Sequence, residues 1–582
     1  MIIKKKNSDD LLTLIVQKII EQINQAICLL NWDYKIQDSD LAYPLEPKMG
    51  DLAFPCFRLS KRLKKPVNII AEELKRKISL TDLILSVKNI NGYLNFCINM
   101  NKATPIILNK IIKEKKKYGD SDIGQKKKIM VEFSSPNTNK PLHLGHLRNI
   151  VIGWSVAQLL EAVGFKVIKA SLLNDRGIHI CKGMVAYKEW GDNKKPTIKP
   201  DHFVGKYYVL FEKEVKKNPN LQKELLKLLD KLEKKSTSTI VLWKRLNKWA
   251  ENGFKETYSN LGVLFDKVYR ESEIYKKGER VILRGFEKGI FKKDKNGAVI
   301  ADLEKYGLPN KVLLRANGTA IYITQDIYLA VLKFKEYRLK KSIYCVGNEQ
   351  DLYLKQLFKI LELLGYYWAK DCYHLSHGMV FLPEGKMKSR EGKVVEADDL
   401  ILKLKVFASE EILKRRLNIQ KTQLSKRSLE IALGALKYYL LQVEPSKNVY
   451  FEPQKSISFI GRTGPYVQYA HARICSILRK AKHLSFSKID YSCLNSKEEK
   501  ELVILLAKFP LVIKKSALNY NPAFLAQYLY QLAEKFNLFY ENSPVLKTNE
   551  KIKKARLLLI SCIKIVINKG LNLLGIATPE KM

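Results

Sequence analysis

The sequence predicts an α/β protein, in which a doubly wound, Rossmann-like parallel-sheet domain stands between a small α+β N-terminal domain and an all-α C-terminal domain. Two observations favour this class. KIMVEFSS (128–135) reads as a buried strand, a helix begins near His146, and KVIKASLL (166–173) gives a second strand. That order is typical of a parallel nucleotide-binding sheet. From about residue 405 onward, helical periodicity continues to the end of the chain.

The chain of 582 residues is too long for one hydrophobic core. We expect an N-terminal domain over 1–115, a central sheet domain over 116–405 and a helical domain over 406–582. Residues 185–310 are charged and largely helical in pattern. They are therefore expected to form an insertion in the central domain.

The strand pattern resumes beyond this insertion. VLLRANGTAIYIT (312–324) and SIYCVG (342–347) read as further strands of the same sheet, and a helix follows the second of them through residue 364. The segment from 114 to 128 is basic and poor in apolar residues. Such a composition indicates a linker or a solvated hinge between the first two domains.

The composition narrows the range of functions. The formal net charge of +44 favours a polyanionic partner, either nucleic acid or an anionic membrane surface. A generally lysine-rich composition is the alternative source of that charge, because lysines occur throughout the chain. No apolar stretch approaches the ~20 residues that span a bilayer, and no secretory signal is evident, so we expect no membrane attachment.

The nine cysteines are scattered and include no CxxC pair. This pattern fits neither a disulfide scaffold nor a structural zinc site, so no metal-binding residues are predicted. Reduced thiols in a cytoplasm are the simplest interpretation.

The most informative segment is SSPNTNKPLHLGHLRNIVIGW (134–154), in which His143 and His146 flank Leu144 and Gly145 where a strand gives way to a helix. The first turn of a helix presents unpaired N–H groups and a positive dipole end, so it suits an anion. Gly145 lets a flat ligand approach, and two imidazoles can donate hydrogen bonds to phosphate oxygens. The alternative is a pair of surface histidines beside a helix cap.

A second basic motif, GKMKSREGKVV (385–395), lies far downstream, with Lys386 placed 243 residues after His143. Lysines such as Lys386 and Lys388 can offset the charge of a leaving pyrophosphate, although a charged Gly-rich loop is often a solvated turn. Together, the two motifs resemble the paired signatures of class I aminoacyl-tRNA synthetases. That class forms an aminoacyl-adenylate on a doubly wound sheet, with the nucleotide at the carboxyl ends of the strands.

Within that class, longer strings resemble the arginyl-tRNA synthetase family over essentially the whole chain. They are VEFSSPNTNKPLHLGHLRN, LLNDRGIHICKGM, KPDHFVGKYYV, YITQDI, GPYVQYAHARICSI and the C-terminal GLNLLGIATPEKM. The resemblance implies ATP-dependent ligation of L-arginine to tRNA(Arg), with Mg²⁺ accompanying ATP. It also implies an N-terminal domain that touches the tRNA elbow, a C-terminal anticodon-binding domain, and a cytoplasmic monomer.

An arginine pocket needs a carboxylate in fixed geometry to hold a planar cation. By resemblance Asp326, expected just beyond a strand end, binds the guanidinium beside Tyr322. The alternative is an Asp that caps the next helix. Glu132, on the strand before the first signature, is a second candidate for the cation. Glu271 is a third candidate, and a solvated surface Glu is its alternative.

The resemblance also assigns contacts to the other substrate groups. Asn137 and Gln350 match positions that hold the α-amino and carboxylate groups of arginine. The nucleotide contacts that it implies are His143, Gly145, His146, Met379, Lys386 and Met387.

The downstream motif has Ser389 where most class I enzymes carry a second lysine. The pyrophosphate is therefore short of one cation. Lys140, three residues before His143, is the residue we expect to supply it; the alternative is a solvated loop lysine. Lys140, His143, His146, Lys386 and Lys388 make up the predicted catalytic set.

The C-terminal helices carry aromatic and cationic groups suited to stacking on unpaired bases and pairing with phosphate. These candidates for tRNA binding are Tyr466, Tyr469, His471 and Arg473. Tyrosines at helical spacing are often core residues instead.

The sequence leaves two other functions open. Another class I synthetase, such as the cysteine enzyme, would be expected to show zinc-binding cysteines. A non-catalytic RNA-binding scaffold with this fold would not need His143, Gly145, His146 and Asp326.

Overall fold

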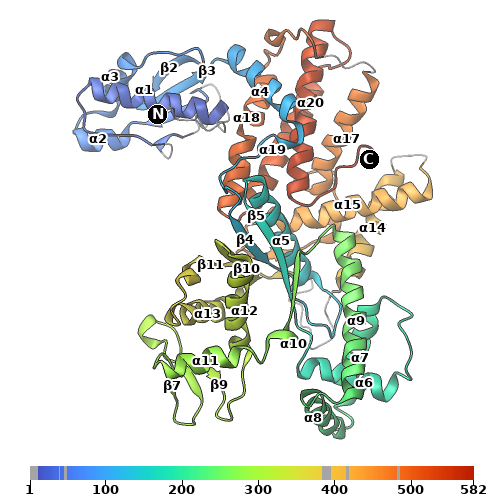
Figure 1. The fold of residues 1–582 in the computed structure, drawn as a ribbon. Helices are drawn as coiled ribbons and strands as arrows, with labels where there is room; N and C mark the ends of the chain where they lie inside the picture. The colour runs from blue at the N-terminus through green and yellow to red at the C-terminus, as the bar shows by residue number, and fades with distance from the viewer. Residues whose placement is uncertain are drawn as a thin grey trace.

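The computed structural model describes residues 11–37, 40–42, 44, 49–382, 395–414, 419–481 and 486–582. Figure 1 shows an elongated arrangement, in which an N-terminal lobe extends sideways from a column of C-terminal helices. A parallel sheet lies below that column, and two further lobes extend downward from the sheet.

The N-terminal lobe is the α+β domain that the sequence predicted. Its antiparallel sheet has the strand order β1-β3-β2, and the β2–β3 hairpin turns at Asn91 and Gly92, whose φ angles are 52° and 79°. Left-handed backbone at both turn residues is what a two-residue hairpin requires. The elements are α1 (Leu11–Leu29), β1 (Leu52–Pro55), α2 (Phe57–Leu63), α3 (Val67–Lys77), β2 (Ile84–Ile90) and β3 (Tyr93–Ile98).

The segment after this lobe is not the solvated hinge that its composition suggested. Helix α4 (Met100–Glu114) leads through the turn η3 (Lys115–Lys117) to Tyr118, which is 3% exposed and donates a hydrogen bond to the Leu506 carbonyl (2.9 Å). Asp120 then pairs with Lys569 at 2.7 Å. The lysines face solvent while Tyr118 and Asp120 dock on the C-terminal helices, so the segment links the two domains but is not a solvated hinge.

The central sheet is parallel, with the strand order β11-β10-β4-β5-β6. Numbered along the chain, these are strands five, four, one, two and three of a doubly wound fold. In such sheets ligands bind where the strand order reverses, which here is between β4 and β10. The strands are β4 (Lys128–Glu132), β5 (Lys166–Leu173), β6 (Lys267–Arg270), β10 (Lys341–Gly347) and β11 (Cys372–His377).

Both faces of the sheet are covered, which explains why its strands are almost continuously apolar. Ile129 and Val131 of β4 pack in the same cluster as α5 (Leu144–Ala162). Met130 belongs to a second cluster, formed with α12 (Tyr322–Tyr337) and α13 (Asp351–Leu363). Alternate residues of β4 therefore pack into two different hydrophobic cores, one on each face of the sheet.

The expected insertion is largely helical, but it contains one strand of the central sheet. Four helices enclose a separate apolar cluster. Strand β6, which lies inside the predicted range 185–310, pairs in parallel with β5. Its four residues are too few for the strand pattern to stand out among charged helices. The four helices are α6 (Ile178–Trp190), α7 (Pro200–Glu214), α8 (Asn220–Glu233) and α9 (Thr237–Leu261).

The prediction that residues 312–324 form a strand of the parallel sheet was also wrong. Strand β9 (Lys311–Leu314) belongs to a small antiparallel sheet with β7 (Lys292–Lys293) and β8 (Val299–Ala301). Helix α12 begins at Tyr322, so the apolar run that looked like a strand is split between a strand, a turn and a helix. Two short helices, α10 (Glu271–Ile274) and α11 (Gly278–Glu287), connect β6 to this small sheet.

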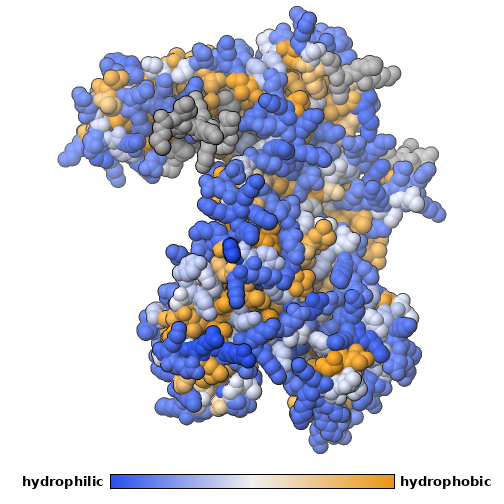
Figure 2. Space-filling view, viewed as in Figure 1, coloured by the Kyte–Doolittle hydropathy of each residue, from blue (hydrophilic) through white to orange (hydrophobic). Residues whose placement is uncertain are grey.

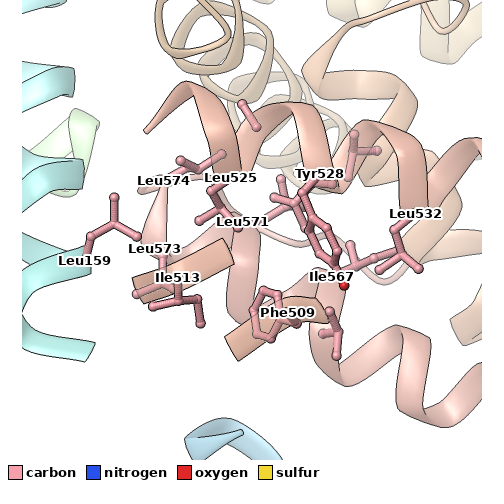
Figure 3. Close-up of a cluster of buried hydrophobic side chains, with 14 of the residues drawn as sticks. Leu159, Phe509, Ile513, Leu525, Tyr528, Leu532, Ile567, Leu571, Leu573 and Leu574 are labelled. Atoms are coloured by element: carbon pink, nitrogen blue, oxygen red, sulfur yellow. The ribbon is translucent and has the colours of Figure 1, made fainter. Parts of the chain in front are cut away.

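The C-terminal region is helical, as predicted, and it packs on the back of α5. Figure 3 shows Leu159 of α5 beside Ile513, Leu525 and Leu573 of this region, all 5% exposed or less. The proposed boundary at 405/406 lies inside α14. The elements are α14 (Ala397–Lys414), α15 (Lys421–Leu441), β13 (Val449–Tyr450), α16 (Pro453–Ser456), α17 (Gly464–Lys480), η8 (Tyr491–Cys493), α18 (Lys497–Leu518), α19 (Ala523–Asn542) and α20 (Glu550–Leu573).

Hydrophilic residues cover most of the face drawn in Figure 2. Among the described helices, none is long and apolar enough to cross a bilayer.

Candidate active site

The two signature histidines form a reciprocal cap at the start of α5. The backbone N–H of Gly145 donates to Nδ1 of His143, and the backbone N–H of His143 donates to Nδ1 of His146, both at 3.2 Å. A neutral imidazole that accepts at Nδ1 carries its proton on Nε2. Each ring therefore keeps one N–H donor, on the nitrogen opposite the cap.

Burial keeps both rings neutral. Burial, with a smaller contribution from the neighbouring Lys140, lowers the pKa of His143 to about 4. The pKa of His146 is also held well below its usual value by burial, by His143 and by Lys140. Burial lowers the pKa of Lys140 as well. The site thus offers two neutral N–H donors beside one lysine, a set suited to phosphate oxygens.

The loop before the histidines is held by two neighbours. Glycine at 205 on α7 lets that helix approach, since a Cβ there would lie 2.6 Å from Cδ of Pro141. The side chain of Asn149 accepts a hydrogen bond from the Ser134 N–H (2.6 Å) and donates one to the Cys345 carbonyl (2.6 Å). Asn149 therefore joins the carboxyl ends of β4 and β10, where the strand order reverses.

Three carboxylates, Glu132, Glu271 and Asp326, lie close enough to interact electrostatically. Asp326 is in the second turn of α12, and not directly after a strand as expected. Burial, with a smaller contribution from Glu132, raises the pKa of Asp326 to about 6, although a hydrogen bond from the Tyr353 hydroxyl opposes the shift. Carboxylates that raise one another's pKa in a protected site favour a bound cation.

Glu271 interacts electrostatically with Asp326. The structure excludes the alternative that Glu271 is a solvated surface residue. It begins α10 directly after β6 and is 5% exposed. Burial raises its pKa to about 7; Asp175 and Asp326 also raise it, while Arg176 lowers it. Asp175 in turn accepts hydrogen bonds from the N–H (2.9 Å) and hydroxyl (2.7 Å) of Ser272, which fixes the start of α10.

Glu132 has a partner that sequence reasoning missed. It is the last residue of β4, and its Oε2 lies 2.6 Å from Nζ of Lys333 on α12, whose side chain is 0% exposed. The same ammonium lies over the ring of Tyr344, 4.3 Å from its centroid. A lysine seven residues after Asp326 is on the same face of a helix two turns away, so the helical spacing was the available signal.

The remaining predicted arginine-binding residues follow strands β4 and β10 or begin helix α12. Tyr322 is the first residue of α12 and is 66% exposed. Asn137, in the loop after β4, forms an isolated bridge with Asn174, the residue after β5. Gln350 ends the turn η5 (Asn348–Gln350), which follows β10. Asn137 and Gln350 are both exposed and lie beyond the ends of adjacent strands, while Tyr322 comes from the neighbouring helix.

Most of the downstream motif, including Lys386, Met387, Lys388 and Ser389, lies outside the described residues. Its last residue, Val395, accepts a hydrogen bond from the Leu144 N–H (3.2 Å). On the other side, the Ala397 N–H donates to the Leu142 carbonyl (2.8 Å), so the two motifs meet at His143.

Met379, a predicted nucleotide contact, precedes strand β12 (Val380–Phe381), which pairs in parallel with β13. Its N–H donates to the side chain of Asn448 at 2.9 Å. Met379 is thereby held at the end of β11, the fifth strand of the central sheet.

The structure corrects one tRNA-binding candidate. His471 is 1% exposed, and its ring lies 3.2 Å from the Pro579 carbonyl, so it holds the C-terminal segment and is closed to a stacking base. Arg473 is partly exposed and lies over Tyr469 and Tyr540, 4.8 and 5.2 Å from their ring centroids. Tyr466 packs against Tyr530 at 5.4 Å.

The geometry defines the class. A doubly wound sheet carries a His-x-Gly-His motif at the start of the helix after its first strand, with a second basic motif returning to that helix. These features identify a class I aminoacyl-tRNA synthetase catalytic domain.

Comparisons with known proteins are specific to one member of that class. The sequence matches the families described as "Arginyl tRNA synthetase N terminal domain" over residues 15–98, "tRNA synthetases class I (R), catalytic domain" over 107–452 and "DALR anticodon binding domain" over 467–582. The chain belongs to the arginyl-tRNA synthetase family.

Individual relatives agree over nearly the full length. An arginine–tRNA ligase of Treponema denticola is 43% identical over 97% of this chain and 99% of its own. One of Borreliella burgdorferi is 41% identical over the same shares. The solved arginyl-tRNA synthetase of Thermus thermophilus superposes with a TM-score of 0.83 at 28% identity, covering 97% of this chain and 100% of that one.

Proposed function

We propose that this protein joins L-arginine to tRNA(Arg) in two steps, consuming ATP and releasing AMP and pyrophosphate. In the first step, a carboxylate oxygen of arginine attacks the α-phosphate of ATP, and the bond to the β-phosphate bridging oxygen breaks. In the second, the terminal ribose hydroxyl of the tRNA attacks the adenylate carbonyl carbon, and AMP leaves. Neither step needs a covalent enzyme intermediate.

One observation carries this proposal. Neutral N–H donors from His143 and His146 lie at the same edge of one parallel sheet as the pocket of Glu132, Glu271 and Asp326. The first set suits the phosphates of ATP and the second suits a guanidinium. The histidines follow β4, which adjoins the point where the strand order reverses, and Glu132 ends that same strand. Asp326 comes from α12, and Glu271 follows the edge strand β6.

The residues then take the following parts. Asp326 and Glu132 hold the guanidinium, and Tyr322 packs beside it. Asn137 and Gln350 orient the α-amino and carboxylate groups, which brings the attacking oxygen to the α-phosphate.

The histidine Nε2–H groups donate to phosphate oxygens as negative charge builds up on them. Lys140, with Lys386 and Lys388 of the downstream motif, offsets the charge of the departing pyrophosphate. Gly145, Met379 and Met387 contact the nucleotide. Mg²⁺ would arrive with ATP, bound largely by its phosphates, and would supply further charge neutralisation there.

The tRNA is bound by the N-terminal and C-terminal regions. Arg473, Tyr469 and Tyr466 offer a cationic and aromatic surface for unpaired bases, and the net charge of +44 favours a large polyanion. The nine cysteines are all free thiols, which supports a cytoplasmic location. We place the enzyme there as a monomer.

ATP–pyrophosphate exchange with each of the twenty amino acids, in the presence of tRNA, tests the proposal. Exchange with arginine alone is expected. Exchange with cysteine or another amino acid would indicate a different class I specificity, and no exchange with any of them would indicate a non-catalytic RNA-binding scaffold.

A further inference from the structure

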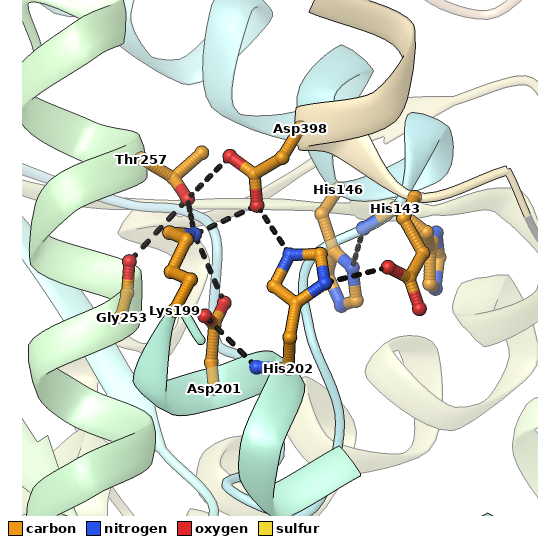
Figure 4. Close-up of polar contacts among 9 residues, drawn as sticks. His143, His146, Lys199, Asp201, His202, Gly253, Thr257 and Asp398 are labelled. Carbon is orange, nitrogen blue, oxygen red and sulfur yellow. Dashed lines mark hydrogen bonds and ion pairs between the residues drawn. The ribbon is translucent and has the colours of Figure 1, made fainter. Parts of the chain in front are cut away.

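A cluster of charged side chains outside the substrate pockets links three separate parts of the chain (Figure 4). His202, near the start of α7, lies between two carboxylates: its Nε2 is 2.7 Å from Oδ2 of Asp398, and its Nδ1 is 2.8 Å from Oε2 of Glu396. Because an ionised carboxylate can only accept a hydrogen bond, both ring nitrogens of His202 must carry a proton, and the ring is therefore an imidazolium. The hydrogen bond to Asp398, followed by that to Glu396, raises the pKa of His202 to about 10.

A lysine completes the cluster. Nζ of Lys199 lies 2.7 Å from Oδ2 of Asp398, 3.2 Å from Oδ2 of Asp201 and 2.6 Å from the hydroxyl of Thr257 on α9. Asp201, His202 and Asp398 have the spacing of a metal site. Lys199 and the imidazolium already pair with these carboxylates and with Glu396, so the cluster is an ion-pair network of two cations and three carboxylates.

This network joins the end of the downstream motif to the helices of the insertion. Glu396 and Asp398 flank Ala397, the first residue of α14, while Lys199 and His202 belong to the start of α7. A Cβ on Gly253 of α9 would lie 2.2 Å from Oδ1 of Asp201, so only glycine admits this carboxylate. The contact is therefore built into the packing of α7 on α9.

The same short segment adjoins the ATP site. The backbone of Glu396 forms an isolated antiparallel bridge with His143, and the neighbouring hydrogen bonds run from Leu144 to Val395 and from Ala397 to Leu142. Side chains at 396 and 398 thus attach to α7, while the backbone between 395 and 397 holds the residues on either side of His143.

We propose that His202 is a positioning residue for adenylate formation: its cationic ring fixes Glu396 and Asp398, and through their backbone it fixes His143. Without a cation at 202, Asp398 keeps Lys199 but Glu396 has no counter-charge in the network, and the bridge to His143 loses its support. The histidine donors would then be displaced from the phosphates, and displacements on this scale are costly to rate. The effect on catalysis rests on the proposed function.

The test compares four proteins by pyrophosphate exchange: wild type, His202→Gln, His202→Lys and a control, Glu212→Gln. Glu212 also lies on α7 and forms an ion pair with Lys182 at 2.7 Å, away from this network. His202→Gln is expected to lower kcat at least about 10-fold with the KM for arginine changed less than about 2-fold. His202→Lys should recover most of the rate, and Glu212→Gln should match wild type.

Wild-type kcat in His202→Gln would overturn the proposal. So would a lysine variant no better than the glutamine variant, or a KM for arginine that rises as kcat falls. If His202→Gln does not fold, Glu396→Gln takes its place, and a smaller loss of kcat is expected. A wild-type kcat in Glu396→Gln, or a KM for arginine that rises as kcat falls, would then overturn the proposal.

A second measurement does not depend on catalysis. Amide hydrogen exchange at Leu144 and Ala397, whose N–H groups form the bridging hydrogen bonds, should quicken at least about 10-fold in His202→Gln and stay unchanged in Glu212→Gln. Unchanged exchange at both amides would reject the positioning role. If the wild-type protein is inactive with every amino acid, the proposed function is rejected. The hydrogen-exchange rates at Leu144 and Ala397 then decide whether His202 positions the His143 backbone.

Discussion

Nζ of Lys333 lies 2.6 Å from Oε2 of Glu132, and their side chains are 0% and 9% exposed. Removing one member of a buried ion pair leaves the other charge uncompensated. We expect Lys333→Met to lower the free energy of unfolding by about 3–5 kcal/mol at pH 7. Calorimetric unfolding measures this, and the double variant with Glu132→Gln should recover most of the loss. A single variant as stable as wild type would contradict the pairing.

Asp326→Asn should separate arginine recognition from ATP binding. A guanidinium left without its carboxylate costs about 3–5 kcal/mol, so the KM for arginine should rise steeply while ATP binding persists. Because burial raises the pKa of Asp326 to about 6, its charge destabilises the unliganded fold above the unfolded value near 3.9. The variant should therefore unfold at a higher temperature at pH 7. Near-normal arginine kinetics would refute the assigned pocket.

Arginine binding should weaken as the pH falls. The pocket holds a cation best when Asp326 is ionised, and with a pKa of about 6 that state is lost as the pH falls. The KM for arginine should rise as the pH drops below about 6, while the KM for ATP stays flat. Burial raises the pKa of Glu271 to about 7, so Glu271→Gln should remove any change in the KM for arginine near pH 7. The change near pH 6, which belongs to Asp326, should remain. A KM for arginine that is flat from pH 5 to 8 would disprove this.

Lys140→Ala should slow adenylate formation by roughly 100-fold or more, the scale of losing one transition-state charge contact. Arginine and tRNA binding should change little, because the contact matters mainly as pyrophosphate departs. Single-turnover activation kinetics provide the measurement. The companion is Lys140→Ala with Ser389→Lys, in which partial recovery would show that either motif can serve one phosphate site. An unchanged rate in Lys140→Ala would exclude Lys140 from the pyrophosphate contact.

Arg473→Ala should weaken tRNA binding, because the guanidinium lies between Tyr469 and Tyr540 on a partly exposed surface. Affinity for wild type should fall steeply with salt as counterions are released. If Arg473 contacts a phosphate, its loss reduces the slope of log K against log salt by about 1. Lys553→Ala, which breaks an exposed intrahelical pair with Glu550, is the control. Equal affinities and slopes for all three proteins would exclude Arg473 from the interface.

The parts of the fold that sequence could predict are those with a strong local pattern. Strands β4, β5 and β10 are long apolar runs, and α5 follows a turn rich in proline and asparagine. Strand β6 was missed because four residues of an edge strand carry too little pattern. Residues 312–324 were misassigned because two short apolar clusters, one in β9 and one at the start of α12, are separated by only a few turn residues.

The candidate site was predictable where a motif is contiguous, as at His143 and His146. It was not predictable where tertiary packing decides. Lys333 meets Glu132 only when α12 lies across the sheet, and His471 is closed to bases only because the C-terminal segment covers it. Sequence periodicity carries no information on which distant element covers a residue.

Helix α5 has a consequence for how this enzyme can be recombined with its relatives. Its first turn forms the histidine cap, and further along the helix the Ser155 hydroxyl donates to the Leu573 carbonyl (3.1 Å), while a Cβ on Gly575 would lie 2.9 Å from the ring of Trp154. The C-terminal helical region alone is therefore not a segment that can be replaced by the corresponding segment of a relative. A chimera must inherit the rear surface of α5 together with the C-terminal segment that covers it.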